Sequence, residues 1–192
     1  MESQIDLCST DIVSNQPEND VRVAVYDLSA QLRAKLSHIL FPFNISGIWH
    51  TEVHVFGQIY YYSDGIVQRD VSEMGFQDFV QFEEIGITTL TPHILNEWVM
   101  SQSDNYTSSK YHVLDHNCCD FANELCEFLT GVSIPLYLRT QSNDFLSTFA
   151  GRKLHPYINT IFANGHVGSG VVDQYRNKYF GRGILSSFRG SS

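Results

Sequence analysis

The sequence lacks the features that mark several large classes of protein. It has no run of about 18 apolar residues, so no membrane span is expected. Basic residues are few, with 12 Lys and Arg against 21 Asp and Glu and a formal net charge of −9, which argues against a nucleic-acid partner. Residues 1–20 carry five acidic side chains and no basic one, unlike a secretory signal peptide. We therefore expect a soluble protein of the cytoplasm, the nucleus or both.

Cysteine is also scarce, and its placement excludes two further classes. The chain has four cysteines: Cys8, Cys118, Cys119 and Cys126. Three of them crowd one segment, which is not a disulfide framework and favours a reducing compartment. There is no Cys-x-x-Cys pair, and His112, His116 and Cys118 lie too close together for the usual zinc-ligand spacing. We expect neither a metal nor another cofactor.

The composition that is present fits one folded domain with two tails. The chain has 192 residues, and 43% of them are hydrophobic, enough for a sizeable core. Residues 1–20 are predicted to be a disordered acidic tail. Residues 163–192 are predicted to be a flexible, glycine-rich basic tail, with residues 171–180 as a transient helix or partner-binding stretch. The domain proper is then 21–162.

Hydrophobic periodicity predicts an α+β fold. Strands are expected where apolar residues alternate, and helices where they recur at three and four residues. The predicted strands are 21–28, 47–56, 59–62 and 79–89, with a tight turn at Gly57-Gln58 and an ambiguous stretch at 66–76. The predicted helices are 29–40, one starting at Thr91-Pro92, 119–130, 144–149 and 155–162.

The helix at 119–130 carries the most informative pattern. Gly131 ends it as a left-handed terminator, and Cys118 stands at its N-terminus. Its buried face is predicted to consist of Phe121, Leu125, Phe128 and Leu129. The helix dipole favours an anion at this end, so a thiol there loses its proton more easily and becomes a nucleophile. The same segment fits equally well a small cysteine that only packs at a helix start.

A cysteine nucleophile needs a base, and His50 is the best candidate. It stands on a predicted strand, which would hold the ring rigidly toward a neighbouring helix. His54 lies four residues further along the same face, so only one of the two can reach Cys118. The remaining histidines are expected to be structural, to be exposed or to orient the local turn: His38, His93, His112, His116, His155 and His166.

Several motifs taken in order resemble a known family. Gly47-Ile48-Trp49-His50-Thr51 is followed by His116-Asn117-Cys118, and then by Phe128-Leu129-Thr130-Gly131. Together they are similar to the PPPDE superfamily, and within it to the DeSI-type deSUMOylating isopeptidases. The resemblance implies a circularly permuted papain-like fold, in which an antiparallel sheet packs against helices and the nucleophile sits at a helix N-terminus. It places the base at His50 and the nucleophile at Cys118.

The same resemblance implies a function. A family member of this type removes a SUMO-like modifier from lysine by thiolate attack on the isopeptide carbonyl, so conjugates of such a modifier are the expected partners. Trp49 and Asn117 are candidates to line the substrate channel. The sequence departs from the family at Cys119-Asp120, and no third catalytic residue is evident. Two alternatives stay open: a protein S-acyl thioesterase using the same Cys-His pair, and a non-catalytic interaction module. The sequence also leaves homodimer formation open.

Overall fold

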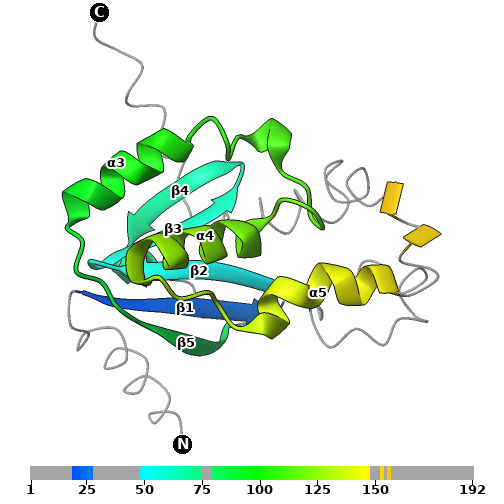
Figure 1. Ribbon diagram of the computed structural model, residues 1–192, viewed down its shortest axis with the longest axis horizontal. Helices are drawn as coiled ribbons and strands as arrows, with labels where there is room; N and C mark the ends of the chain where they lie inside the picture. Colours follow the sequence, from blue (N-terminus) through cyan, green and yellow to red (C-terminus); the bar gives the residue numbers. More distant parts are fainter. Residues whose placement is uncertain (1–18, 28–47, 75–78, 148–151, 154, 157–192) are drawn as a thin grey trace, which may run out of the picture.

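A computed structural model describes residues 19–27, 48–74, 79–147, 152–153 and 155–156 (Figure 1). Within these residues, five antiparallel strands form one sheet in the order β4-β3-β2-β1-β5, with three α-helices against it. The elements are β1 (Asp20–Asp27), β2 (Trp49–Val55), β3 (Gln58–Ser63), β4 (Gly65–Asp70), η1 (Val71–Glu73), β5 (Phe79–Ile87), α3 (Pro92–Gln102), η2 (Ser108–Lys110), α4 (Cys118–Thr130) and α5 (Leu136–Ser147).

Both faces of the sheet are buried at its centre, which explains why β1 is an almost continuous apolar run. Val21, Val23 and Val25 share one core with the helices. Ala24 and Tyr26 point the other way and belong to a second cluster of buried residues. Successive side chains of a strand alternate between the two faces, so an unbroken apolar stretch marks a strand covered on both sides.

The three α-helices cover the same face of the sheet (Figure 1). Leu95 of α3, Leu125 of α4 and Leu138 of α5 are fully buried in the core that also contains Val23 and Val53. Helix α4 lies across the middle of the sheet, against β2 and β3. Three of the four residues of its predicted apolar face, Phe121, Leu125 and Leu129, are buried, while Phe128 is partly buried at the edge of the core. The pattern on which the helix was predicted is thus confirmed at these three positions.

The boundaries of several elements differ from the prediction. The hairpin turn between β2 and β3 is centred on Phe56 and Gly57, one residue earlier than expected, and both residues have positive φ (53° and 69°) as a type I′ turn requires. The ambiguous stretch forms β4 and η1. Helix α5 begins at Leu136 rather than near residue 144, because the Leu138 N–H donates to the Pro135 carbonyl at 3.1 Å and starts the first turn. Only two residues of α5 are buried, so its amphipathic pattern is weak.

The predicted α+β class is confirmed by this arrangement of sheet and helices. The predicted helix at 29–40, most of the one at 155–162, residues 1–18 and the C-terminal tail fall outside the described residues. Asn19 and Asp20, the last two residues of the predicted acidic tail, are described, and Asp20 begins β1. The predicted domain limits therefore stay predictions. Among the described helices, none combines the length and apolar content needed to cross a membrane.

Candidate active site

Strand β2 pairs with β3 over only part of its length, and the candidate site lies where this pairing is missing. β2 pairs with β1 along its whole length, from Trp49 opposite Asp27 to His54 opposite Arg22. It pairs with β3 only from Val53 onward, while the end of β3 continues in register with β4 alone. The first half of β2 therefore presents an edge that β3 does not occupy. The thiol of Cys118, at the start of α4, interacts there with the backbone of Thr51.

The start of α4 is fixed by a capping box. The Asn117 side-chain oxygen accepts from the Cys119 N–H at 2.8 Å, and the Asp120 carboxylate accepts from the Asn117 N–H at 2.7 Å. These bonds satisfy donors that the first turn of a helix otherwise leaves unpaired. Asp120 thus accepts a hydrogen bond from the cap, and Cys118 becomes the first residue of the helix.

His50 and Cys118, which stand 68 positions apart in the sequence, interact directly in the structure. Burial opposes a charge on His50, but the charge and hydrogen bond of Cys118, followed by those of Glu52, raise the pKa of His50 from 6.5 to about 10. The ring is held between Tyr26 and Tyr61, with centroid distances of 5.9 and 5.5 Å. The shift favours an imidazolium beside a thiolate at neutral pH.

The Cys118 thiol is tuned toward its anion by its neighbours. A hydrogen bond from the Cys119 thiol lowers the pKa of Cys118 well below its usual range, and the charge of His50 adds to this effect against the effect of burial. The pKa of Cys119 moves the opposite way, because its thiol hydrogen bonds to Cys118 and is buried. Only the thiolate is a strong nucleophile, so these opposite shifts favour Cys118 over Cys119 as the attacking sulfur.

Cys119 is held in place by polar contacts. Its sulfur lies 3.0 Å from the side-chain nitrogen of Gln141 in α5 and 3.6 Å from the Thr51 hydroxyl. Gln141 also accepts from the Trp49 backbone N–H at 2.9 Å, and so ties α5 to the start of β2. Cys119 is 3% exposed, so it is packed within the protein.

Glu52 is a residue that the sequence interpretation missed. Its carboxylate is 3.8 Å from Nε2 of His50 and 3.8 Å from Nε2 of His54, both within ion-pair distance. Tyr26 donates to it at 2.8 Å, and Arg69 of β4 forms a buried ion pair with it. Burial alone would raise the pKa of Glu52, yet His50, His54 and Arg69 lower it far below its usual range. The carboxylate is therefore a buried anion behind the imidazole.

His54 has different surroundings from His50. It is 1% exposed and its ring packs edge-on against Phe82 at 5.2 Å. Burial lowers its pKa against the opposing effect of Glu52, which favours its neutral form. The alternation His50-x-Glu52-x-His54 was a usable signal for Glu52, because it places all three side chains on one face of β2.

The two channel candidates have different surroundings. Trp49 is half-buried beside α5, where its ring meets that of Tyr137 edge-on at 5.9 Å. Asn117 is 5% exposed, and its amide group is engaged by the helix cap and by the Val113 carbonyl at 3.2 Å. We assign Asn117 to the architecture of the turn, and Trp49 remains a candidate wall.

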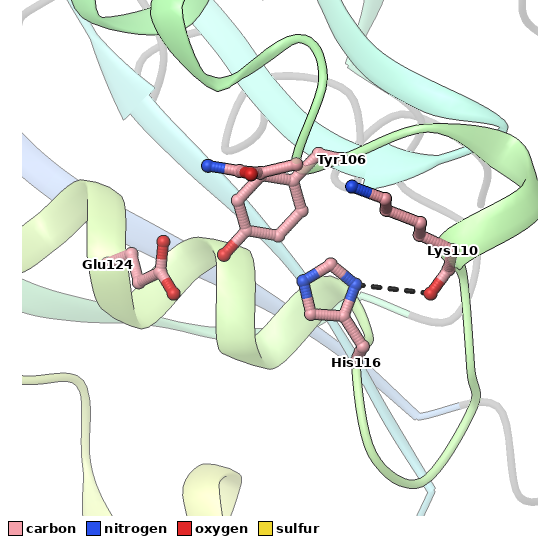
Figure 2. A pocket seen from close by; sticks show the side chains of 5 residues that line it. Tyr106, Lys110, His116 and Glu124 are labelled. Carbon is pink, nitrogen blue, oxygen red and sulfur yellow. Dashed lines mark hydrogen bonds between the residues drawn. The ribbon is translucent and has the colours of Figure 1, made fainter.

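A surface pocket lies next to this site on the opposite side of the loop that leads into α4. Figure 2 shows His116 against Tyr106, with Lys110 and Glu124 at the sides. The His116 and Tyr106 rings are stacked at 4.7 Å, and Nδ1 of His116 is 3.2 Å from the Lys110 carbonyl oxygen. His116 thus stabilises the loop before Cys118, as expected of a residue that orients the turn.

Comparison with known proteins places this geometry in a family. Residues 19–158 match the PPPDE peptidase domain. The chain belongs to the PPPDE peptidase family. Desumoylating isopeptidase 1 of Xenopus laevis is 36% identical over 145 residues, which are 73% of this chain and 85% of that protein. Desumoylating isopeptidase 1 of Homo sapiens is 32% identical over 155 residues, 79% of this chain and 91% of that protein. A homolog from Caenorhabditis elegans is 27% identical over 109 residues, 50% of this chain and 32% of that protein.

Membership of the PPPDE family confirms the resemblance read from the motifs. It also confirms the predicted fold class, a circularly permuted papain-like domain with an antiparallel sheet packed against helices. The chain is a cysteine-type hydrolase by family. The roles of individual residues rest on the geometry given above.

Proposed function

We propose that this PPPDE protein is a cysteine isopeptidase that removes a SUMO-like modifier from lysine side chains. The observation that carries the proposal is the pairing of Cys118, at the capped start of α4, with His50 at the unpaired end of β2. The relatives named desumoylating isopeptidase, at 32% and 36% identity over most of their length, support the substrate class.

The chemistry is acyl transfer in two steps. The Cys118 thiolate attacks the isopeptide carbonyl carbon, and the carbon–nitrogen bond breaks as His50 gives its proton to the leaving lysine amine. Neutral His50 then takes a proton from water, the resulting hydroxide attacks the thioester, and the sulfur leaves as the thiolate. The N–H of Cys118, the first residue of α4, has no partner within the helix and is the natural donor to the oxyanion.

Glu52 has the role of a positioning residue in this scheme. Its carboxylate lies on the Nε2 side of the His50 ring, while His50 also interacts with Cys118. A fixed anion behind the imidazole holds the ring and favours its charged form, the part that a carboxylate or amide plays in catalytic triads. Arg69 and Tyr26 hold the carboxylate in turn.

The part of the substrate expected to enter the site is the C-terminal tail of the modifier, which ends in two glycines. Such a tail passes through a groove too narrow for larger side chains, and half-buried Trp49, next to His50, is suited to wall it. A thioesterase would need an apolar channel for an acyl chain, but it would use the same Cys-His pair.

A probe panel tests the proposal. The full chain is incubated with vinyl-sulfone derivatives of SUMO and of ubiquitin, and separately with a palmitoyl-thioester substrate. We expect covalent capture of the SUMO probe by the wild type and none by Cys118→Ser, with cleavage of SUMO conjugates lost in His50→Ala.

Each other result of the panel has a defined meaning. Preference for the ubiquitin probe would refute the modifier class and retain the mechanism. Turnover of the thioester without reaction of either modifier would favour the thioesterase. Absence of all three reactions in a folded protein would favour an interaction module.

A further inference from the structure

The loop between η2 and α4 closes on itself and presents two side chains together. The His112 N–H donates to the His116 carbonyl at 2.9 Å, and the His116 N–H donates to the His112 carbonyl at 2.9 Å. The Asp115 N–H also donates to the His112 carbonyl at 3.2 Å. This closed turn places the Asp115 carboxylate 3.0 Å from Nδ1 of His112.

A third side chain reaches the same point from a distant part of the chain. Nε2 of His155 lies 3.3 Å from the Asp115 carboxylate, across a sequence separation of 40 residues. The segment that carries His155 is anchored at the end of α5, because Arg152 donates to the Leu146 and Ser147 carbonyls at 3.2 and 2.7 Å. The two imidazole nitrogens and the carboxylate oxygen all lie within 4.8 Å of one another.

The contacts of His112 bring its Nδ1 atom against the carboxylate. The backbone N–H groups of Leu114 and Asp115 point at Nδ1 from 3.4 and 3.2 Å, and the Asp115 oxygen lies 3.0 Å from the same atom. Nδ1 has one lone pair, so a cation bound there would replace these two backbone contacts. A cation between Nδ1, the Asp115 oxygen and Nε2 of His155 can accept a lone pair from each of them.

We propose that His112, Asp115 and His155 form a binding site for Zn²⁺, separate from the His50–Cys118 pair. With metal–ligand bonds of about 2.0–2.1 Å, neighbouring ligands of tetrahedral zinc are about 3.3 Å apart. The two separations from the Asp115 oxygen, 3.0 and 3.3 Å, match that edge. The side chains of His112, Asp115 and His155 are 27%, 54% and 39% exposed, so the site is open to an entering ion and to water as a fourth ligand.

The donor set selects the class of metal. Imidazole nitrogen suits zinc and its neighbours among the transition metals, whereas Mg²⁺ and Ca²⁺ prefer oxygen ligands. The sequence-level argument against a metal considered only ligands that are close in sequence. His155 enters the site through tertiary structure, which that argument could not include.

A bound zinc ion would connect two parts of the molecule. It would fix the segment at residues 152–156 to the loop that runs into Asn117 and the start of α4. Figure 1 shows this segment beyond the C-terminal end of α5, on the side of the molecule where α4 begins. A metal that binds the folded state alone stabilises it in proportion to its concentration over Kd.

The test is titration of Zn²⁺ into the untagged full chain, followed by calorimetry. Cys118→Ser is the background, so that the reactive thiol does not contribute. We expect one equivalent to bind and the affinity to fall about 100-fold in both His155→Ala and Asp115→Asn, since even the loss of a residue behind a ligand costs 10–100-fold. His93→Ala is the matched control: His93 is exposed and lies 3.7 Å from Glu97, but has no third ligand.

Two further measurements keep the result decisive. When Co²⁺ is bound in place of Zn²⁺, the absorption spectrum should show bands in the visible range and no thiolate charge-transfer band. Zn²⁺ should raise the Tm of the parent protein and not that of His155→Ala, whose Tm without metal should equal the parent's. Equal affinity in parent and His155→Ala, a thiolate band, equally tight binding of Ca²⁺, or no binding by the parent would each overturn the site.

Discussion

At the scale of single residues, the adjacent cysteines offer the sharpest prediction. Cys118→Ser should abolish hydrolysis, because a serine hydroxyl in this place is not ionised by His50 as a thiol is. Cys119→Ala removes the largest influence that lowers the pKa of Cys118, but the charge and hydrogen bond of His50 and the Thr51 backbone remain, so it should keep most of the activity. The rates at which the two variants cleave a SUMO conjugate test this prediction. An active Cys118→Ser with a dead Cys119→Ala would reverse the assignment of the nucleophile.

Glu52 gives a second prediction at this scale. Glu52→Gln keeps the size of the side chain but removes the anion that helps raise the pKa of His50. The alkaline limb of the pH profile of kcat/KM should move to lower pH, and kcat should fall. Arg69 would lose its buried partner, so the free energy of unfolding should drop by about 3 kcal/mol.

A purely structural role for Glu52 would have a different signature. It would lower the stability and leave the alkaline limb of the remaining activity in place. Urea unfolding and a pH profile of the same preparation therefore separate the two roles.

At the scale of elements, the cap at the start of α4 affects both the stability of the protein and the geometry of the candidate active site. Asn117→Ala removes the cap, which should lower the free energy of unfolding by about 1 kcal/mol. It should also lower kcat/KM, because Cys118 is the next residue and the cap fixes its backbone. Thr91→Ala is the matched control, since Thr91 caps α3 by accepting from the Ile94 N–H at 3.4 Å.

The comparison of the two caps isolates the catalytic effect. Thr91→Ala should lose a similar amount of stability and keep full activity, because α3 is not part of the site. Equal activity in both variants would show that the cap of α4 does not position Cys118.

At the scale of the whole molecule, the ion pair of Cys118 and His50 predicts the pH dependence. The pKa of His50 is raised from 6.5 to about 10, so its proton is held across the neutral range. Activity should be constant there, fall on the acid side as Cys118 is protonated, and fall near pH 10 as His50 loses its proton. A profile of kcat/KM between pH 4 and 11 tests this, and an alkaline limb near pH 7 would contradict the ion pair.

The same shifts set the pH dependence of stability. The raised pKa of His50 stabilises the fold fully below its unfolded value of 6.5, and this contribution is lost as the pH rises through about 10. The lowered pKa of Glu52 stabilises the fold above its unfolded value of 4.5, and this contribution is lost as the pH falls. These two contributions are both complete between pH 4.5 and 6.5, so thermal melting should show their combined maximum in that range.

The sequence by itself determined the parts of this protein that depend on local physics. The spacing of Phe121, Leu125, Phe128 and Leu129 predicted the helix, and Gly131 was predicted to end it. The cap at Asn117 was recognised only in the structure. Alternation predicted β1 and β2, and placed His50, Glu52 and His54 on one face. The motifs around His50 and Cys118 identified the family, because they combine a strand residue and a helix start that few folds share.

Tertiary structure alone decided which of these side chains meet. Nothing local shows that β2 pairs with β3 only from Val53 onward, and the edge of β2 left before Val53 is what lets Cys118 reach Thr51 and His50. Arg69 and His155 are distant in sequence from the groups they contact, since Arg69 comes from the far edge of the sheet and His155 from beyond α5. The pKa values of Cys118, His50 and Glu52 depend on burial and on charges that only the folded chain brings together.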